Sequence, residues 1–202
     1  LLNTVALVFE DGFAKTEAIA IPTLLEKLPP ARPAELHAAM IAKDVSGDHI
    51  LATTVGRGQA AITLAETRPD AEVSLWFHDQ YQQQLVVSAV QEFPERLGLY
   101  CEADAPLSPH GGQYDLAVVP VSKSGDAEFT RDVLQTAFQA LGVGGHLVAA
   151  VDNPQDKWLR SHLAATGETV RVRPEASEKP TTVCYIVQKT RPLKKVRDFE
   201  CK

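Results

Sequence analysis

A strand-like run that ends in two closely spaced glycines is the feature that most constrains the fold of this chain. Residues 49–55 are apolar and β-branched, Gly56 and Gly58 follow, and residues 59–66 then carry apolar side chains at helical spacing. The first glycine permits a tight turn, and the second lets the backbone come close to a ligand. This order predicts a strand, a ligand-binding turn over residues 54–60 and a helix.

The same alternation of strand-like and helix-like segments continues along the chain, which predicts a mainly parallel sheet with crossover helices. The expected strands are residues 49–55, 72–77, 97–101, 114–119 and 146–151. The expected helices are residues 59–66, 85–93, 129–141 and 158–165. We expect the third of these helices to be capped by the glycines at positions 142, 144 and 145, because glycine adopts the positive φ of a helix C-cap.

The last two strand-like segments, residues 168–173 and 181–188, flank a polar turn with two prolines and predict an antiparallel hairpin at the sheet edge. The expected fold class is therefore α/β. It is Rossmann-like and doubly wound, with a mostly parallel seven-stranded sheet that ends in a C-terminal antiparallel hairpin.

Three regions are expected along the chain. Residues 1–46 form an N-terminal cap segment with a strand at Val5–Phe9, a helix that begins near Pro22 and a second helix at Ala34–Ala42. Residues 47–190 form the α/β domain. Residues 191–202 are basic without apolar periodicity, which is typical of a linker, here to a C-terminal domain outside this sequence. Since no initiator methionine or signal pattern opens the chain, we expect a piece of a larger protein.

Composition narrows the cellular setting. No apolar run approaches the roughly 20 residues that span a bilayer, so no membrane segment is expected. The three cysteines, Cys101, Cys184 and Cys201, are odd in number and far apart, which favours a reducing compartment and a cytoplasmic location.

Charge is unevenly distributed along the chain. Residues 1–149 carry a formal balance of −10, whereas residues 150–202 carry +4. Any contact with nucleic acid is therefore expected on the C-terminal part. A solvated surface with a basic tail explains the same asymmetry without a partner.

An acidic residue completes the expected ligand site. Asp79 ends the strand that follows the glycine turn and lies 21 residues after Gly58. At that place a carboxylate accepts hydrogen bonds from both ribose hydroxyls of an adenosine cofactor. The alternative is that the glycines serve the turn alone and that Asp79 is solvated.

The order of these segments resembles the class I S-adenosylmethionine-dependent methyltransferases over about residues 47–190. The matching segments are Thr54–Ala60, Phe77–Asp79, Glu102–Ala105, Tyr114–Val119 and Leu141–Val148. The resemblance implies S-adenosylmethionine as cofactor and places Gly56 and Gly58 under its methionine and ribose parts. It further implies that Asp79 holds the ribose and that Asp104 faces the adenine amino group.

Two departures from that family pattern bear on activity. Thr54 stands where the family usually has an acidic residue that orients the methionine ammonium, so a weaker grip on the cofactor is expected. Amino-methylating members carry Asn/Asp-Pro-Pro-Tyr/Phe after the fourth strand, and this chain has Val-Pro-Val-Ser-Lys at 119–123. Either Ser122 or Lys123 takes a polar role there, or the segment is an ordinary loop. No catalytic residue is assigned.

This combination most resembles the N-terminal half of the tandem-domain bacterial small-subunit ribosomal RNA guanine-N2 methyltransferases. The resemblance implies a substrate-binding or scaffolding domain, with ribosomal RNA and a catalytic C-terminal domain of the same chain as partners. Two alternatives stay open. One is an active methyltransferase on RNA or a small molecule, and the other is a NAD-dependent oxidoreductase, whose glycine pattern Gly56, Gly58 and Ala61 also satisfy.

Other catalytic or metal patterns are weak in this sequence. The six histidines have no His-Glu-x-x-His or Cys-x-x-Cys context, so no metal site is expected. No Gly-x-Ser-x-Gly elbow of a hydrolase occurs. Trp76 and Phe77 are expected in the sheet core rather than on a base-stacking surface.

Overall fold

The computed structural model describes residues 6–10, 13–17, 28–89, 97–101 and 114–193. The strands are β1 (Ala6–Glu10), β2 (Phe13–Glu17), β3 (His49–Thr53), β4 (Glu72–Phe77), β5 (Leu97–Cys101), β6 (Tyr114–Val121), β7 (Leu141–Val151), β8 (Val170–Pro174) and β9 (Val183–Gln188). The helices are α1 (Pro33–Ala42), α2 (Gln59–Thr67), α3 (Gln80–Ala89), α4 (Ala127–Ala140) and α5 (Trp158–Ala164).

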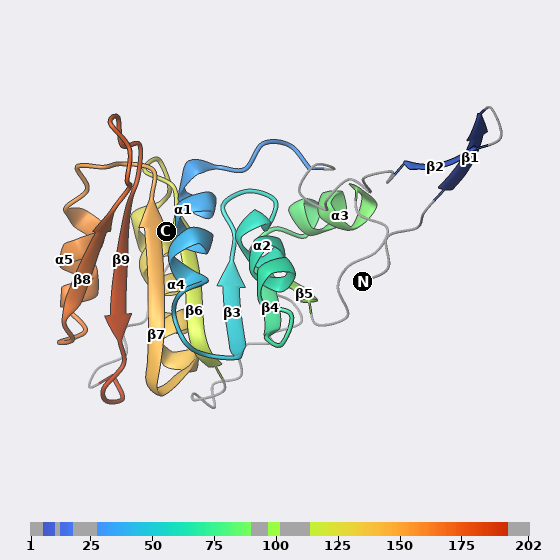
Figure 1. The fold of residues 1–202 in the computed structure, drawn as a ribbon. Helices are drawn as coiled ribbons and strands as arrows, with labels where there is room; N and C mark the ends of the chain where they lie inside the picture. Colours follow the sequence, from blue (N-terminus) through green and yellow to red (C-terminus); the bar gives the residue numbers. More distant parts are fainter. Residues whose placement is uncertain (1–5, 11–12, 18–27, 90–96, 102–113, 194–202) are drawn as a thin grey trace.

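Seven of these strands form one sheet in the order β5-β4-β3-β6-β7-β9-β8 (Figure 1). Five neighbouring strands, β5, β4, β3, β6 and β7, are parallel to one another. Strand β9 is antiparallel to both of its neighbours, β7 and β8. The chain enters this sheet at its central strand β3 and adds β4 and β5 on one side. It then crosses back and adds β6 on the other side of β3. This reversal is a topological switch point, and ligands of open α/β sheets bind beside it at the carboxyl ends of the strands. The expected doubly wound sheet with a terminal hairpin is confirmed.

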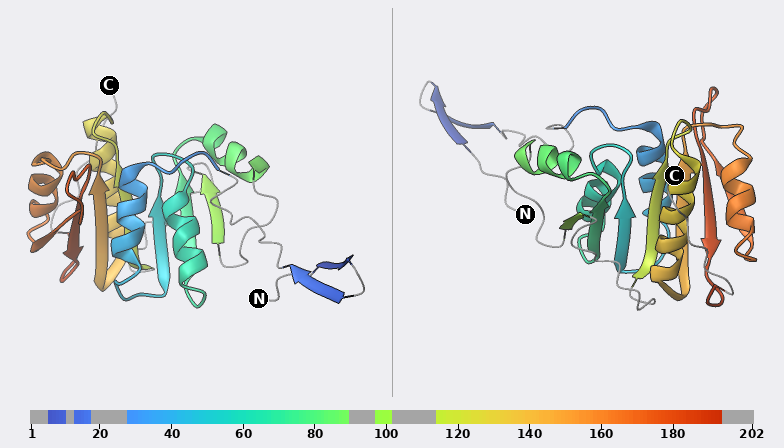
Figure 2. Two further views of the ribbon diagram at one scale, coloured as in Figure 1. Left: turned by 45° about the horizontal axis from the view of Figure 1, so that its top comes forward. Right: turned by 180° about the vertical axis from the view of Figure 1, so that it is seen from behind.

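Helices cover both faces of the sheet (Figure 2). Apolar side chains of α1, α2 and α3 pack with those of one face, and side chains of α4 and α5 pack with those of the other. Successive residues of the central strands therefore alternate between two cores: Ile50 and Ala52 join the first, and Leu51 joins the second. This explains why β3 and β6 are almost continuously apolar.

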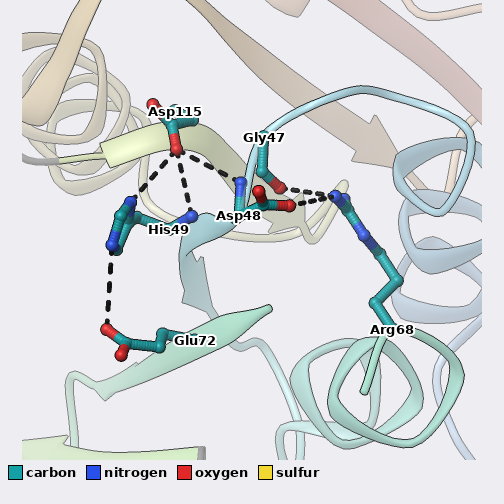
Figure 3. A network of polar contacts seen from close by, with 6 residues as sticks. All are labelled: Gly47, Asp48, His49, Arg68, Glu72 and Asp115. Carbon is teal, nitrogen blue, oxygen red and sulfur yellow. Dashed lines mark hydrogen bonds and ion pairs between the residues drawn. The ribbon is translucent and has the colours of Figure 1, made fainter. Parts of the chain in front are cut away.

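A polar network joins the strands at the amino edge of the sheet, opposite the switch point (Figure 3). Asp115 of β6 accepts hydrogen bonds from the backbone amides of Asp48 (3.2 Å) and His49 (3.1 Å) and contacts Nδ1 of His49 at 3.2 Å. His49 Nε2 lies 3.8 Å from Glu72 of β4, and Arg68, the residue that follows α2, lies 3.7 Å from Asp48. The network links β3, β4 and β6 near their amino ends.

The N-terminal region contains more structure than the sequence pattern predicts. β1 covers most of the strand expected at Val5–Phe9, and it pairs with β2, which was not expected. The helix expected at Ala34–Ala42 is present as α1, and its buried side chains pack onto the sheet face beside α2. The helix expected near Pro22 lies outside the described residues. The domain boundary at residue 46 stays a prediction.

The expected glycine cap of α4 is wrong. The helix ends at Ala140, and β7 begins at Leu141 in extended conformation. The positive φ of Gly144 (+97°) belongs instead to an irregular start of β7. A lysine caps the helix: Nζ of Lys189 donates to the carbonyls of Gln139 (3.0 Å) and Leu141 (2.5 Å). Cations are favourable at this helix end because unpaired carbonyls gather there.

Candidate cofactor cleft

A cleft of about 370 Å³ opens at the carboxyl edge of the sheet, beside the switch point. Its volume lies within the range of small-molecule sites, roughly 300 to 1,000 Å³. The cleft is bounded by the glycine turn after β3, the end of β4 and the segment before α1. Its lining residues are Pro29, Pro30, Arg32, Thr54, Val55, Gly56, Arg57, Gln59, Phe77, His78, Asp79 and Gln82.

The glycine turn forms one wall of the cleft, and Gly58 is required there for two reasons. Its φ of +74° is in the left-handed region, and an added Cβ would come within 2.2 Å of Cδ2 of Leu75. Leu75 is fully buried, so it has little room to move. Gly58 thus allows α2 to begin directly against β4, which is the close helix–strand packing expected of this turn.

A buried carboxylate that the sequence analysis missed supports the turn from below. Glu35 of α1 is fully buried, and its Oε1 accepts hydrogen bonds from the Thr54 hydroxyl and from the amide of Val55 (3.2 Å). Its Oε2 accepts from the amide of Ala60 (3.0 Å) in the first turn of α2. Burial raises the pKa of Glu35, although the hydrogen bonds to the turn lower it in part.

The sequence does carry a signal for Glu35. It lies on the buried side of α1 with four alanines and one histidine, which are Ala34, His37, Ala38, Ala39 and Ala42. A glutamate on such a buried side must find hydrogen-bond donors inside the protein. Its partners lie 19 to 25 residues away in the chain, so the pattern shows that donors are needed but not which ones.

Thr54 is held within the turn. Its hydroxyl donates to Glu35 and accepts from the amides of Gly56 and Gly58, each at 2.9 Å. A hydroxyl has one donor and two acceptor positions, and all three are in use. Thr54 also lines the cleft, so its expected contact with the cofactor stays a prediction. The acidic group at this turn comes from Glu35.

Asp79 lies where the sequence analysis placed it, at the end of β4 on the cleft wall. Its Oδ1 accepts a hydrogen bond from the amide of Tyr81 (2.8 Å), in the first turn of α3. Within the described part of the chain, the other carboxylate oxygen forms no hydrogen bond. Asp104 lies outside the described residues. Two guanidinium groups that the sequence analysis did not single out, Arg32 and Arg57, line the same cleft.

The cleft continues toward the end of β6 in a second, much smaller pocket of about 80 Å³. The residues shared by both pockets are Thr54, Val55 and His78. The strand end that carries the amine-binding motif in the resembled family is buried here, with Val119 1% and Val121 5% exposed. No carboxylate or carboxamide occurs among the described lining residues of this pocket.

Aromatic side chains close one side of the small pocket. The His78 ring lies 4.8 Å, edge to face, from the Phe129 ring and 4.6 Å from the Trp76 ring. Burial lowers the pKa of His78 to about 4, so its imidazole is neutral at physiological pH. Ser122 lines the pocket but contacts Ser124 at 3.1 Å, and Lys123 is not among the described lining residues.

Among the residues that the structure describes, no group of three or more His, Cys, Asp or Glu side chains is arranged to hold a metal ion. No helix there has the length and apolar character to cross a bilayer.

The strand order, the glycine turn after the central strand and the terminal antiparallel hairpin together define the class I methyltransferase fold. Solved structures agree. An O-methyltransferase family protein from Burkholderia thailandensis matches with a TM-score of 0.58 and 12% identity, over 77% of this chain and 56% of its own. The S-adenosylmethionine-dependent O-methyltransferase of Thermotoga maritima matches with a TM-score of 0.60 and 15% identity, over 96% and 80%.

A third similar structure is the T. thermophilus 16S rRNA N2 G1207 methyltransferase in complex with AdoMet and guanosine. It matches with a TM-score of 0.59 and 15% identity, over 97% of this chain and 47% of its own. The chain thus spans about half the length of this protein and of the B. thailandensis protein. No protein-family model and no curated protein sequence matches. At these identities the likeness is one of fold.

Proposed function

We propose that this chain is a methyltransferase-fold domain that binds S-adenosylmethionine weakly, does not transfer its methyl group, and serves as the substrate-binding or scaffolding half of an RNA methyltransferase. The observation that carries the proposal is the contrast between the two ends of the cleft. The end at the glycine turn is open and about 370 Å³ in volume, whereas the end at β6 is apolar and about 80 Å³.

Methyl transfer to an exocyclic amine requires groups that accept its hydrogen bonds and space for the base beside the sulfonium. The strand end here has the buried apolar residues Val119, Pro120 and Val121 instead, and the neighbouring imidazole of His78 is neutral. A pocket of about 80 Å³ is well below the roughly 300 Å³ at which small-molecule sites begin. These features support a domain without transfer activity.

The open end fits an adenosyl cofactor in part. Gly56 and Gly58 allow its close approach, and Asp79 supplies a carboxylate for the ribose. The contact of Asp104 with the adenine stays a prediction from the sequence. Arg57 has the charge to pair with the carboxylate of the methionine part. No accessible acid lies at the described turn for the ammonium, because the Glu35 carboxylate is enclosed beneath it. Weak binding follows.

A dinucleotide cofactor fits less well. Such cofactors place their pyrophosphate at the N-terminus of the helix after the glycine turn. At α2 the Ala60 amide already donates to the carboxyl group of Glu35. A backbone donor that a pyrophosphate would need is therefore in use, which disfavours the oxidoreductase alternative.

The RNA part of the proposal has two supports. One similar structure is a 16S rRNA methyltransferase of which this chain spans about half, and the positive charge of this chain is concentrated after residue 149. A catalytic second domain beyond the basic segment 191–202 and a cytoplasmic location stay predictions.

Isothermal titration calorimetry with S-adenosylmethionine tests the cofactor part. We expect binding that is weakened at least tenfold by Asp79→Ser, which removes the carboxylate but keeps a good helix cap for α3. Asp132→Ala removes an exposed carboxylate of α4 away from the cleft and serves as the matched control. Absence of binding to the unmodified chain, or an equal loss in both variants, would contradict the proposal.

Transfer is tested with methyl-labelled S-adenosylmethionine and unmodified small-subunit ribosomal RNA, and we expect no label in the RNA. The second candidate, an active methyltransferase, is favoured by the open cleft at the glycine turn. Label that enters the RNA and disappears with Asp79→Ser would establish that candidate and remove the non-catalytic assignment.

A further inference from the structure

A second hollow lies on the sheet face that α1 covers, away from the cofactor cleft. Its volume is about 300 Å³. Its lining comes from the end of α1 and the residues after it, from β7 and β9, and from β8. Figure 1 shows β7, β9 and β8 side by side in the sheet, with α1 packed on one face. We call it the β8 groove. Its lining residues are Ile41, Asp44, Val45, Ser46, His146, Arg171, Arg173 and Ile186.

Strand register places two arginines of the β8 groove on the same side of β8. Arg171 pairs with Ile186 and Arg173 pairs with Cys184 across the β8–β9 ladder. Cys184 and Ile186 pack in the core on the α1 side, so both arginines point to that side. Because Arg171 and Arg173 are two residues apart on one strand, their Cα atoms are separated by roughly 7 Å. Both side chains are exposed.

In the part of the chain that the structure describes, neither guanidinium group forms an ion pair. Among the described residues, no carboxylate lies within 4.0 Å of either group. The carboxylates that flank β8 are satisfied by hydroxyl and amide donors instead: Glu168 accepts from Thr190, and Glu175 accepts from residues 181 and 182. Neither is therefore left to neutralise the arginines by a direct ion pair.

The remaining ionisable groups of the β8 groove leave an excess of positive charge. Asp44 is the one acid among its described lining residues, and it lies in the segment after α1 and not on β8 with the two arginines. Burial and the nearby Arg171 lower the pKa of His146, so this imidazole is neutral at physiological pH. The groove therefore carries two cations and one anion on an open surface.

We infer that the β8 groove binds the phosphate backbone of RNA. Arginine recognises phosphate through paired N–H donors, and two arginines along one strand suit successive phosphates of a chain better than a single small anion. No Phe, Tyr, Trp, Asn or Gln occurs among the described lining residues, so no stacking or amide contact would read the bases. Binding here would therefore orient RNA without selecting its sequence. This inference rests on the proposed role of the chain in RNA methylation.

Fluorescence anisotropy with a fluorescein-labelled RNA hairpin of about 20 nucleotides, titrated with the full chain at roughly 50 to 200 mM salt, tests the inference. We expect the double variant Arg171→Gln/Arg173→Gln to raise Kd about tenfold at the lowest salt. Each lost phosphate contact lowers the slope of log affinity against log salt by about 0.7 to 0.9, so the slope should fall by roughly 1.4 to 1.8.

The matched control is Lys157→Gln/Arg160→Gln, which removes the same charge from exposed positions at the start of α5 and within it, on the opposite face of the sheet. We expect this variant to bind within about twofold of the unmodified chain. Non-specific electrostatic attraction would weaken RNA binding by both double variants equally, so a loss confined to Arg171→Gln/Arg173→Gln indicates direct contact at the β8 groove. An equal loss in both variants, or no RNA binding by the unmodified chain, would overturn the inference.

Calorimetry with S-adenosylmethionine on the same variants separates this inference from the proposed function. Loss of RNA binding with unchanged cofactor binding supports the β8 groove as an independent site. If Arg171→Gln/Arg173→Gln binds RNA as tightly as the unmodified chain, and cofactor binding is observed, the inference about the β8 groove is wrong and the proposed function stands. Cofactor binding that fails in every protein, with arginine-dependent RNA binding intact, contradicts the cofactor part of the proposed function and leaves the groove supported.

Discussion

Replacement of Glu35 is the sharpest test of how the glycine turn is held. The carboxylate accepts three hydrogen bonds from the turn and from α2, although it comes from a different helix. Glu35→Ala removes all three acceptors, whereas Glu35→Gln keeps one oxygen and nearly the same volume. Glu35→Ala therefore tests whether the site must be filled by a hydrogen-bond acceptor. Glu35→Gln tests whether the group there must be able to ionise.

The magnitude for Glu35→Ala follows from what each donor can do afterwards. Thr54 and Val55 are half-buried, so water can reach them, but Ala60 is fully buried. One buried amide without a partner costs about 1 to 3 kcal/mol, and the one lost methylene carbon, Cγ, adds about 0.8 kcal/mol. We expect a loss of about 3 kcal/mol, or roughly 6 to 12 °C in melting temperature for a chain of this length.

The pH dependence of Glu35→Gln has a definite sign. Burial raises the pKa of Glu35 in the folded state, so the folded chain binds more protons than the unfolded chain above the ordinary glutamate pKa. The free energy of unfolding of the unmodified chain therefore falls as pH rises from that value through the folded pKa, by about 1.4 kcal/mol per pH unit within the window. A glutamine side chain does not titrate, so the variant should gain stability relative to the unmodified chain over the same window.

Urea unfolding followed by tryptophan fluorescence, at a series of pH values from about 4 to 8, measures both effects. Two tryptophans, Trp76 in the core and Trp158 on α5, report the transition. Parallel stability curves for the unmodified chain and Glu35→Gln would refute the raised pKa. A cost of less than about 1 kcal/mol for Glu35→Ala would refute the role of the carboxylate in holding the turn.

Three further stability predictions can be checked by the same unfolding experiment. Gly58→Ala should cost about 2 to 4 kcal/mol, from its positive φ and the contact with Leu75, whereas Gly144→Ala, with positive φ but no atom within 4 Å, should cost about 1 kcal/mol. Lys189→Met should cost about 2 kcal/mol, because it leaves the carbonyls at the end of α4 unpaired. Asp115→Asn should cost on the order of 1 kcal/mol at neutral pH. Hydrogen bonds from His49 lower the pKa of Asp115, so this difference should disappear as pH falls below its ordinary pKa, and a difference that persists in acid would contradict it.

The architecture could be predicted because its determinants are local. The apolar run before Gly56, the amphipathic pattern of α4 and the polar turn between β8 and β9 each specify one element, and right-handed crossovers then restrict how those elements connect. Asp79 was found for the same reason, since its position depends only on where β4 ends. Each of these features is readable within a short window of sequence.

The parts that could not be predicted depend on contacts between distant segments. Glu35 supports a turn 19 to 25 residues later, and Lys189 caps a helix that ends far earlier in the chain, at Ala140. In both cases the sequence shows a charged residue at an inward-facing position. Glu35 lies on the buried side of α1, and Lys189 follows the buried Val187 by two residues. Such a residue shows that a partner must exist. Only the fold shows which one.

The two ends of the cleft differ in polarity and packing, which bears on the proposed lack of transfer activity. At the glycine turn, polar groups are retained at an energetic cost, since Glu35 is buried with a raised pKa. At the end of β6, Val119 and Val121 are packed as core residues, which stabilises the fold and fills the space beside the turn. Introducing an asparagine at Val119 would therefore bury an amide among apolar neighbours without opening room for a base. The proposed lack of transfer activity therefore depends on the packing of the whole strand end and not on one missing side chain.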